Sequence, residues 1–355
     1  MNILFASNDN GTDMLAVALY SVLKNNPANI TFFIFNSEIS TTNRQRIARL
    51  ADPKNNIKVT FIDVDPAKVA GIALTNKTVS MEAYYRYLAA ELLPGEDEVL
   101  YMDIDMMCVG SLKDLYDTEL DGYYLAAVED YFVSQTEDYP GFKTGIGFSK
   151  EDKYINSGLL LMNLAAMRES KIMEQFWNNL KNKKALIPSE FNIFADQTVT
   201  NLTFRGRIKF VDQKYNVLTT AMKYTKPKKV IIAHFAGPDK PFTYRDDYSA
   251  KYDDIYYDYY DECMAIVGTN GNRMIKNTIL RLGKETTDAN ARANELGVLA
   301  RDKSHHVIEL TEQVGAIKER LVESEQSLEN IKEAKSWPLV KAILGLERRI
   351  RSLFR

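Results

Sequence analysis

Leu100-Tyr-Met-Asp-Ile-Asp-Met-Met107 places two carboxylates, Asp103 and Asp105, at the end of an apolar run. Such a run is typical of a buried strand, and side chains at positions i and i+2 of an extended segment lie on one face. Both carboxylates can therefore reach one divalent cation. Carboxylates that follow strands also cap turns or stay in solvent, so the Asp-x-Asp triplet alone leaves these alternatives open.

A second apolar run, Val230-Ile-Ile-Ala-His234, ends in a histidine and is followed by Gly237 and Lys240. If both runs are strands of one parallel-type sheet, their C-terminal ends open onto the same crevice, where α/β sheets bind ligands. His234 then shares a metal ion with the two acids, or it serves only as a hydrogen-bonding residue. Oxygen and nitrogen ligands, with positions left for phosphate oxygens, favour Mn²⁺ over Ca²⁺, with Mg²⁺ as the alternative.

Around the Asp pair, the first 110 residues alternate short apolar runs with helical stretches. This alternation predicts an α/β fold in which helices cover a mostly parallel central sheet. The expected strands are 3–6, 30–35, 58–64 and the run that ends in the Asp pair, and the expected helices are 14–25, 41–51 and 81–93.

Polar side chains follow the first expected strand, where Asn8, Asp9, Asn10 and Gly11 lead into a helix. No Gly-x-Gly-x-x-Gly turn is present there, so the dinucleotide-binding fingerprint is missing. The three polar side chains are candidates to bind a base edge and a ribose. Asp9 or Asn10 can equally cap the next helix.

The long segment 110–230 is irregular, and such long connections are often functional. Within it, 155–163 is expected to be a buried strand, and a helical stretch begins near Phe194. Asp196 and Gln197 in that stretch either cap the helix or face solvent, or they point into the crevice as ligands. Further along, aromatic residues spaced three and four apart over 252–262 predict an amphipathic helix that packs on the domain.

The composition bounds the class of protein. The chain has 355 residues, of which 45% are apolar and 26% charged, as in ordinary globular proteins, and its net charge of −3 provides no basic field for nucleic acid. The two cysteines, Cys108 and Cys263, form no Cys-x-x-Cys pair, so neither a disulfide framework nor a zinc site is indicated, and a reducing cytoplasm suits them. No signal-peptide run and no apolar run of about 18 residues is present, so neither secretion by such a signal nor a membrane span is expected.

The C-terminal third changes character, because one apolar stripe repeats there in alternating steps of three and four residues. That spacing is the seam of a left-handed coiled coil and predicts a homo-oligomer, although the stripe can also lie against the chain's own domain. His305 and His306, at the start of this helix, are expected to be solvated. The stripe consists of Val307, Leu310, Val314, Ile317, Leu321, Ser324, Leu328 and Ile331.

The last twenty residues, 336–355, combine apolar side chains with five basic ones and a single acid, Glu347. This pattern is typical of a helix that lies in the headgroup region of an anionic bilayer, and a tail that packs on a partner subunit is the alternative. The expected organisation is a catalytic domain over 1–270, a linker over 271–284, a coiled coil over 285–335 and a basic amphipathic tail over 336–355.

Six stretches resemble, in the same order, the motifs of bacterial members of glycosyltransferase family 8, which include lipopolysaccharide and capsule galactosyl- and glucosyltransferases, and more distantly those of glycogenins. All lie within residues 1–245. They are Ile3-Leu-Phe-Ala-Ser-Asn-Asp-Asn10, Tyr85-Arg-Tyr87, Leu100-Tyr-Met-Asp-Ile-Asp105, Tyr154-Ile-Asn-Ser-Gly-Leu-Leu-Leu-Met-Asn-Leu164, Ala195-Asp-Gln-Thr198 and His234-Phe-Ala-Gly-Pro-Asp-Lys-Pro241.

The resemblance implies a GT-A type fold that transfers a hexose from a UDP-sugar with retention of configuration, using Mn²⁺. It also implies a role for each matching position. The metal ligands would be Asp103, Asp105 and His234, with Ile104 between the two acids in the donor site. Ala6, Asn8 and Asn10 would contact uridine, Arg86, Asn156, Asp196 and Gln197 would surround the donor sugar, and Gly237 and Lys240 would hold the diphosphate.

Two of these positions bear on the chemistry. Gln197 would lie near the sugar, and because an amide is a poor nucleophile, a same-face dissociative displacement is expected in place of a double displacement. Asp196 would orient sugar hydroxyls. At Asn8, relatives often carry an acid that binds the uracil edge, so the amide here leaves the nucleotide preference open.

The expected function is therefore a retaining hexosyltransferase that moves glucose or galactose from a UDP-sugar to a glycan or glycolipid acceptor in surface polysaccharide or lipopolysaccharide synthesis. It would act in the cytoplasm, at the inner face of the membrane. Two alternatives remain. One is a glycogenin-like enzyme that glycosylates one of its own twenty tyrosines. The other is a non-catalytic oligomeric scaffold of a glycan-assembly complex.

Overall fold

The computed structural model of the protein describes residues 1–72, 80–136, 138–237, 240–241, 249–268, 310 and 312–326. The chain divides into two compact units, one formed by residues 1–284 and the other by residues 285–355.

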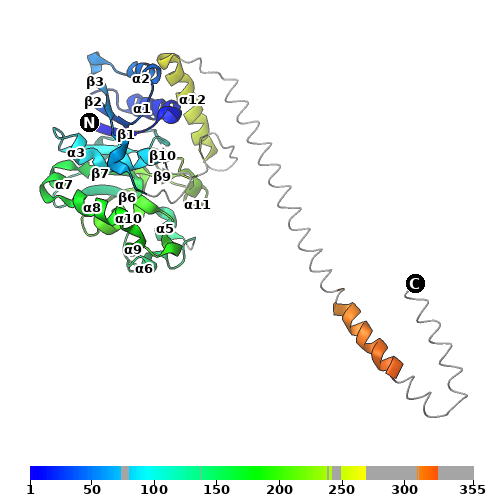
Figure 1. The fold of residues 1–355 in the computed structure, drawn as a ribbon. Coiled ribbons are helices and arrows are strands. Elements are labelled where there is room, and N and C mark those ends of the chain that lie inside the picture. The colour runs from blue at the N-terminus through cyan, green and yellow to red at the C-terminus, as the bar shows by residue number, and fades with distance from the viewer. Residues whose placement is uncertain are drawn as a thin grey trace, which may run out of the picture. The chain divides into compact units, whose positions relative to one another are not determined.

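The first unit is built on a seven-stranded sheet, which Figure 1 shows at its centre. Four neighbouring pairs in it are parallel, and one strand, β7, runs antiparallel to both of its neighbours. The predicted α/β class with a mostly parallel sheet is confirmed, and β7 makes the sheet mixed. In spatial order the strands are β3 (Ile57–Asp63), β2 (Ile30–Asn36), β1 (Asn2–Ala6), β4 (Glu98–Met102), β7 (Ile155–Asn163), β6 (Leu125–Glu129) and β8 (Ile208–Val211).

Both faces of this sheet are covered, and the alternation of side chains along β1 shows how. Ile3 and Phe5 belong to one apolar cluster, whereas Leu4 and Ala6 belong to a second one. Successive side chains of a strand point to opposite faces, so the two clusters lie on opposite faces of the sheet. A strand buried on both faces reads as a continuous apolar run, which is why the run before the Asp pair has no polar interruption.

Helices supply the rest of each cluster. Those that pack with Ile3 and Phe5 include α1, α2 and α12, and those that pack with Leu4 include η4, α7 and α8. The α-helices of this unit are α1 (Thr12–Asn25), α2 (Thr41–Ala48), α3 (Ala89–Leu92), α4 (Lys113–Tyr116), α5 (Tyr131–Gln135), α6 (Phe142–Gly145), α7 (Leu164–Ser170), α8 (Ile172–Lys181), α9 (Lys183–Leu186), α10 (Ala195–Thr203), α11 (Met222–Thr225) and α12 (Ala250–Val267). Short 3₁₀ helices that matter below are η1 (Asp9–Gly11), η4 (Met81–Leu88) and η6 (Gln213–Tyr215).

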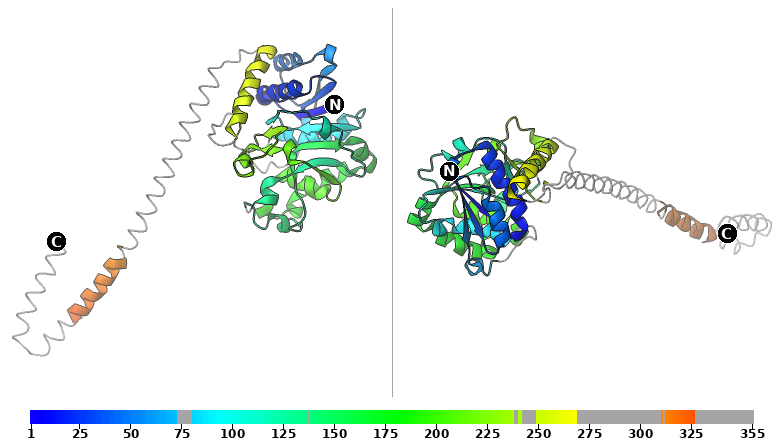
Figure 2. Two further views of the ribbon diagram at one scale, coloured as in Figure 1. Left: turned by 180° about the vertical axis from the view of Figure 1, so that it is seen from behind. Right: turned by 90° about the horizontal axis from the view of Figure 1, so that it is seen from above.

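The aromatic tract expected to form an amphipathic helix does so as α12. Tyr252, Tyr256 and Cys263 on it are buried in the same cluster as α1. Figures 1 and 2 both show α12 lying alongside α1. Its tyrosine spacing therefore serves packing.

A second, three-stranded sheet lies beside the first and consists of β5 (Met106–Cys108), β10 (Ile232–His234) and β9 (Val217–Leu218). The prediction that the run ending in His234 belongs to one parallel sheet with the run before Asp103 is wrong. β10 pairs antiparallel with β5, the strand that follows the Asp pair, and parallel with β9. The run 230–234 is too short to distinguish these pairings by its composition, because a strand of either sheet would be buried and apolar.

In the second unit, residues 312–326 form a helix. Val314 and Ile317 on it are each 49% exposed, so the apolar stripe is not covered in the described chain. The structure shows a helix here and not a coiled coil, which therefore stays a prediction. His305, His306, the whole linker over 271–284 and the whole basic tail lie outside the described residues. No helix among the described residues has the length and apolar character needed to cross a bilayer.

Candidate functional site

The two acids of the Asp-x-Asp triplet lie in a tight turn that joins β4 to β5. β4 ends at Met102 and β5 begins at Met106, and the Met106 amide donates to the Asp103 carbonyl at 3.2 Å. The expected extended geometry is therefore wrong, because the chain must reverse into the second sheet at this point. The turn itself brings the two carboxylates together.

Neighbouring backbone holds this turn on both sides. The Asp103 amide donates to the Gly158 carbonyl of β7 at 2.9 Å, and the Phe235 amide donates to the Asp105 carbonyl at 3.0 Å. The turn is thus fixed between the main sheet and the strand that carries His234.

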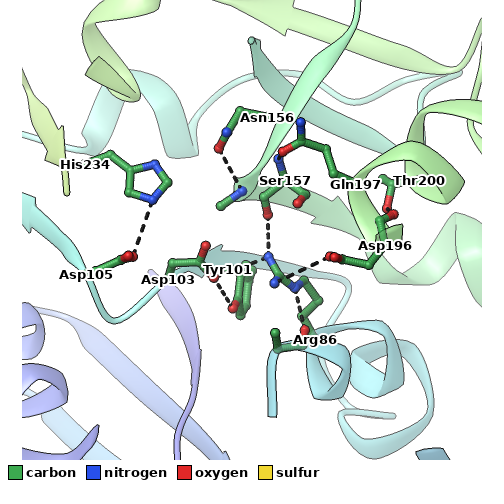
Figure 3. A network of polar contacts seen from close by, with 12 residues as sticks. Arg86, Tyr101, Asp103, Asp105, Asn156, Ser157, Asp196, Gln197, Thr200 and His234 are labelled. Carbon is green, nitrogen blue, oxygen red and sulfur yellow. Dashed lines mark hydrogen bonds and ion pairs between the residues drawn. The ribbon is translucent and has the colours of Figure 1, made fainter. Parts of the chain in front are cut away.

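His234 lies beside the turn because of the pairing of β10 with β5, in which it stands opposite Met106. Its Nε2 is 3.4 Å from Oδ1 of Asp105. One ligand atom from each of Asp103, Asp105 and His234 lies within 4.8 Å of the others. Figure 3 shows the imidazole directed at the Asp105 carboxylate.

Several features of this cluster fit a divalent cation. Oδ1 of Asp105 is buried and accepts no hydrogen bond from the described residues, so it has an unused lone pair. The side chains of Asp103 and Asp105 remain 27% and 13% exposed, which leaves a substrate access to them. Two carboxylate oxygens and one imidazole nitrogen form a ligand set that suits Mn²⁺.

Gly158 on β7 leaves room for this cluster. A Cβ atom at this position would lie 2.6 Å from Cε1 of His234 and 2.8 Å from Oδ2 of Asp103. Real Cβ atoms essentially never approach other atoms this closely, so any larger residue here would require His234 or Asp103 to shift.

The pKa values of Asp103 and Asp105 are shifted in opposite directions. Burial raises the pKa of Asp103, and the nearby Asp105 carboxylate adds to this rise, although Arg86 opposes it. Burial would also raise the pKa of Asp105, but His234 and Lys240 outweigh it and lower that pKa below the ordinary range. Lys240 donates to Oδ2 of Asp105 and also to the Phe235 carbonyl, at 3.3 Å. Lys240 and Arg86 thus place positive charge beside the acid pair before any ligand binds.

Arg86, from η4, lies on the main-sheet side of the pair. Its Nη1 donates to the Ser157 carbonyl at 2.6 Å and lies 3.3 Å from Oδ1 of Asp103, and its Nη2 lies 3.7 Å from Oδ2 of Asp196. Burial would lower the pKa of this guanidinium, but Asp103, the neighbouring phenols and Asp196 raise it well above its usual value. Figure 3 shows the guanidinium between Asp103 and Asp196. Arg86 therefore stays charged and holds Asp103 and Asp196 at a fixed separation.

Tyr101 adds a second contact to Asp103. The guanidinium of Arg86 packs over the Tyr101 ring, 4.4 Å from its centroid, and the Tyr101 hydroxyl donates to Oδ1 of Asp103 at 2.5 Å. Tyr101 lies two positions before Asp103 on the same side of the chain. The strand that leads into the turn thus helps to orient the first acid.

Asp196 and Gln197 begin α10 and are only 5% and 7% exposed, so the alternative that they face solvent is wrong. Asp196 accepts from the Tyr87 hydroxyl at 3.1 Å. Oε1 of Gln197 accepts from the Ser157 amide at 3.0 Å, and its Nε2 donates to Asp130 at 3.2 Å. Both ends of the Gln197 amide are therefore engaged and its orientation is fixed.

Asp130, at the end of β6, connects Gln197 to Asn156. Its Oδ2 accepts from Nδ2 of Asn156 at 3.0 Å as well as from Gln197, and its Oδ1 caps α5 by accepting from the Val133 amide at 3.1 Å. The sequence reasoning missed Asp130. Two acids, Glu129 and Asp130, follow the apolar run Leu125–Val128, and acids at the end of such a run are the signal that could have identified Asp130.

The polar stretch after β1 takes mixed roles. Asn8 caps η1 by accepting from the Gly11 amide at 3.2 Å, whereas Asp9 accepts from the Ser40 amide and from Asn43, each at 2.8 Å. The following helix, α1, has Gly11 at its N-cap and no side-chain cap, so the alternative that Asp9 or Asn10 caps it is wrong. The start of α2 holds Asp9 instead. Asn10 is exposed.

The Asp turn reaches this stretch through Ile104. A Cβ atom at Gly11 would lie 2.8 Å from Cδ1 of Ile104, so that side chain packs against η1. Ala6 ends β1, next to β4 in the sheet, and Gly237 has φ = +76°, a backbone conformation that favours glycine. The candidate residues thus come from both sheets, and the contacts at the turn after β4 join Arg86, His234 and Lys240 to the two acids. The sequence around Asn216, which is described below, does not mark it as a site residue. Gly158 is marked only by the polar Asn-Ser step that precedes it.

Comparisons with known proteins find relatives over the part of the chain that carries these residues. The family model described as "Glycosyl transferase family 8" matches residues 2–245. A lipopolysaccharide 1,2-glucosyltransferase of Escherichia coli K12 is 25% identical over 255 residues, which cover 68% of this chain and 72% of that protein. A lipopolysaccharide 1,3-galactosyltransferase of Salmonella typhimurium LT2 is 24% identical over 257 residues, with the same coverage of 68% and 72%.

Among solved structures, the crystal structure of galactosyltransferase LgtC in complex with donor and acceptor sugar analogues is similar, with a TM-score of 0.64 and 29% identity. The match covers 74% of this chain and 96% of that one. The part of the chain that matches is the part that carries the site.

Proposed function

The chain belongs to glycosyltransferase family 8, a family of retaining UDP-sugar hexosyltransferases, and on this premise we propose that it transfers glucose or galactose from a UDP-sugar to a glycan or glycolipid acceptor. The acceptor would belong to surface polysaccharide or lipopolysaccharide synthesis, as the similarity to two lipopolysaccharide glycosyltransferases suggests. The observation that carries the proposal is the meeting of Asp103, Asp105 and His234 within one cluster, with Arg86 and Asp196 beside it.

The proposed residue roles follow the charge that develops in the reaction. As the bond between the sugar and UDP breaks, negative charge grows on the β-phosphate and positive charge on the anomeric carbon. A Mn²⁺ or Mg²⁺ ion held by the two acids and His234 would supply Lewis-acid stabilisation of the leaving phosphate. Lys240, which already contacts Asp105, is placed to move its ammonium onto the same diphosphate, and Gly237 supplies the turn before it.

The engaged state of Gln197 supports a displacement without a covalent enzyme intermediate. Its carbonyl oxygen accepts from the Ser157 amide, so the oxygen is already used, and an amide is a weak nucleophile. The acceptor hydroxyl would then attack from the face that the departing diphosphate leaves, which retains the configuration. In this proposal Asp196 and Asn156 orient sugar hydroxyls, while Ala6, Asn8 and Asn10 contact the uridine, with Ile104 packed behind them.

A panel of UDP-sugars tests the proposed donor and metal. We expect UDP release from UDP-glucose or UDP-galactose in the presence of Mn²⁺ and an acceptor glycan, loss of that release with a chelator, and recovery with Mn²⁺ but not with Ca²⁺. The measurement is UDP formed over time, with the new linkage analysed by NMR for retention. An absence of turnover with every UDP-hexose in Mn²⁺, on a set of lipopolysaccharide and lipid-linked acceptors, would contradict the proposal.

We also propose that the C-terminal region assembles and localises the enzyme. The described helix 312–326 carries Val314, Ile317 and Leu321 at the spacing of a coiled-coil seam, and two of these side chains are half exposed. A second copy of the same helix would cover them. The basic tail over 336–355 would then hold the oligomer at an anionic membrane surface on the cytoplasmic side, where its cations and apolar groups can both be satisfied.

A truncation series separates these two roles. The full chain is expected to be an oligomer and to float with anionic vesicles, a chain ending at Lys335 to remain an oligomer without floating, and a chain ending at Lys284 to be a monomer. The measurements are sedimentation velocity and vesicle flotation. A monomeric full chain would contradict the proposed coiled coil. Equal flotation of the full chain and the chain ending at Lys335 would contradict the proposed membrane role of the tail.

A further inference from the structure

Behind His234, away from the two acids, lies a chain of buried amides that ends at a backbone N–H. The Nδ1 atom of His234 is 2.9 Å from Oδ1 of Asn216, and Nδ2 of Asn216 donates to Oδ1 of Asn156 at 2.9 Å. The same Oδ1 of Asn156 accepts from the Gly158 amide at 3.0 Å. Asn216 is 3% exposed and His234 is also 3% exposed, so water does not replace these contacts.

The backbone N–H of Gly158 fixes the direction of every hydrogen bond in this chain. A backbone amide can only donate, so the Asn156 atom that faces it must be the carbonyl oxygen. Asn216 must then present its NH₂ group to that oxygen, and its own carbonyl oxygen is left facing the imidazole. The hydrogen-bond partner of that oxygen has to be a donor, so Nδ1 of His234 must carry the hydrogen.

The other end of Asn156 agrees with this assignment. Its Nδ2 donates to the carboxylate of Asp130, which accepts in its ionised form. Turning the Asn156 amide over would oppose donors at Gly158 and acceptors at Asp130, and turning the Asn216 amide over would oppose its oxygen to Oδ1 of Asn156. The chain therefore has one satisfied arrangement.

From this geometry we infer that Asn216 is a positioning residue that holds His234 as its Nδ1–H tautomer, with the lone pair of Nε2 directed at the acid pair. The inference rests on the proposed function, in which His234 binds a divalent cation. Nε2 is the nitrogen that lies 3.4 Å from Asp105, so the tautomer set by Asn216 is the one that can bind a cation there.

The backbone makes Asn216 suited to this task. It connects η6 to β9, and β9 pairs in parallel with β10, placing Leu218 opposite His234. The position of Asn216 behind the imidazole is thus fixed by the same small sheet that places His234 beside Asp105. An amide at this position is neutral, whereas a carboxylate would add a third negative charge next to Asp103 and Asp105 and favour the protonated imidazolium, which has no lone pair for a metal ion.

The first experiment reads the tautomer directly in the full chain without metal. The sequence holds only three histidines, so the signals of ¹⁵N-labelled His234 can be assigned by difference with a His234→Gln protein. At a pH where the imidazole is neutral, we expect the Nδ1–H form in the native protein and loss of that preference in Asn216→Leu. Asn216→Asp, which keeps an acceptor for Nδ1–H, is expected to retain it.

The second experiment measures Mn²⁺ binding by electron paramagnetic resonance titration. Asn216→Leu is expected to bind Mn²⁺ about 10- to 100-fold more weakly, as is usual when the partner of a metal-binding histidine is lost. Asn26→Leu is the matched control, because Asn26 is a buried amide that accepts from the Leu112 amide at 2.9 Å and contacts none of the candidate ligands. It should leave both the tautomer and the affinity unchanged.

The outcomes are distinct. An Nε2–H tautomer in the native protein, or an unchanged tautomer in a folded Asn216→Leu protein, overturns the inference even if the protein binds Mn²⁺ and transfers sugar. Equal loss of the Nδ1–H form in Asn216→Leu and Asn216→Asp also overturns it, because an effect of volume alone would then explain the data. Failure of the native protein to bind Mn²⁺ while the Nδ1–H form depends on Asn216 contradicts the proposed function and leaves the positioning role supported.

Discussion

Replacing Asp103 by asparagine should lower the rate of sugar transfer by about three orders of magnitude, which corresponds to about 4 kcal/mol of lost transition-state stabilisation. The change keeps the shape of the side chain and an oxygen for the Tyr101 hydroxyl and Arg86, which lie at 2.5 and 3.3 Å. It removes the negative charge that would bind the cation. The measurement is kcat/KM for the donor with saturating Mn²⁺, together with the Mn²⁺ dissociation constant.

Asp63→Asn is the matched control for this change. Asp63 also ends a parallel strand of the main sheet, β3, but its side chain is 68% exposed and pairs with Arg44. The control protein should retain its rate within about twofold. An Asp103→Asn protein that still binds Mn²⁺ and transfers sugar at the native rate would contradict the proposed site. If glycan assembly in cells survives Asp103→Asn, the alternative of a non-catalytic scaffold is favoured.

The second large effect is expected for Gly158→Ala, which should lower both Mn²⁺ affinity and the transfer rate by about 100-fold or more. The added methyl group would occupy the space 2.6 Å from the His234 ring and 2.8 Å from Asp103, so at least one candidate ligand must move. Overpacking of this kind costs about 1 to 3 kcal/mol of folding free energy, which a domain of this size survives. The measurements are a Mn²⁺ titration, kcat/KM and thermal unfolding.

Gly95→Ala provides the control, because a Cβ atom there meets no atom within 4 Å. Its metal affinity and rate should match those of the native protein. Gly158→Ala is informative even if its stability falls. A loss of Mn²⁺ affinity that exceeds the loss of folding stability indicates a displaced ligand, whereas a loss of stability alone indicates a damaged fold. A stable Gly158→Ala protein with native Mn²⁺ affinity would show that the cation does not bind between His234 and Asp103.

The sequence predicts the parts of the structure whose signals are local. The runs in β1, β2 and residues 159–162 of β7 are continuous and apolar because they are buried on both faces, and the tyrosine spacing of α12 follows the helical period. Asp103, Asp105 and His234 could be singled out because a polar group directly follows each apolar run. Residues at strand ends in α/β proteins are natural candidates for a ligand site.

The local sequence does not determine which distant strands pair with one another. The run before His234 reads equally well as a strand of the main sheet and as a strand of a second sheet, and only the contact with β5 decides between them. Asn216 and Gly158 matter through atoms they contact in space, and neither their type nor their spacing sets them apart. Asp196 and Gln197 looked as suited to capping as to binding, because the burial of the start of α10 depends on its packing against β7.

The ladder between β5 and β10 also has a consequence for biosynthesis. It joins segments more than a hundred residues apart in the sequence, so closing it requires a long loop to be ordered first. A ribosome therefore synthesises both acids well before the imidazole, and a chain that ends before His234 carries only two of the three candidate ligands. Under the proposed function, sugar-nucleotide consumption would begin only once the chain extends past His234.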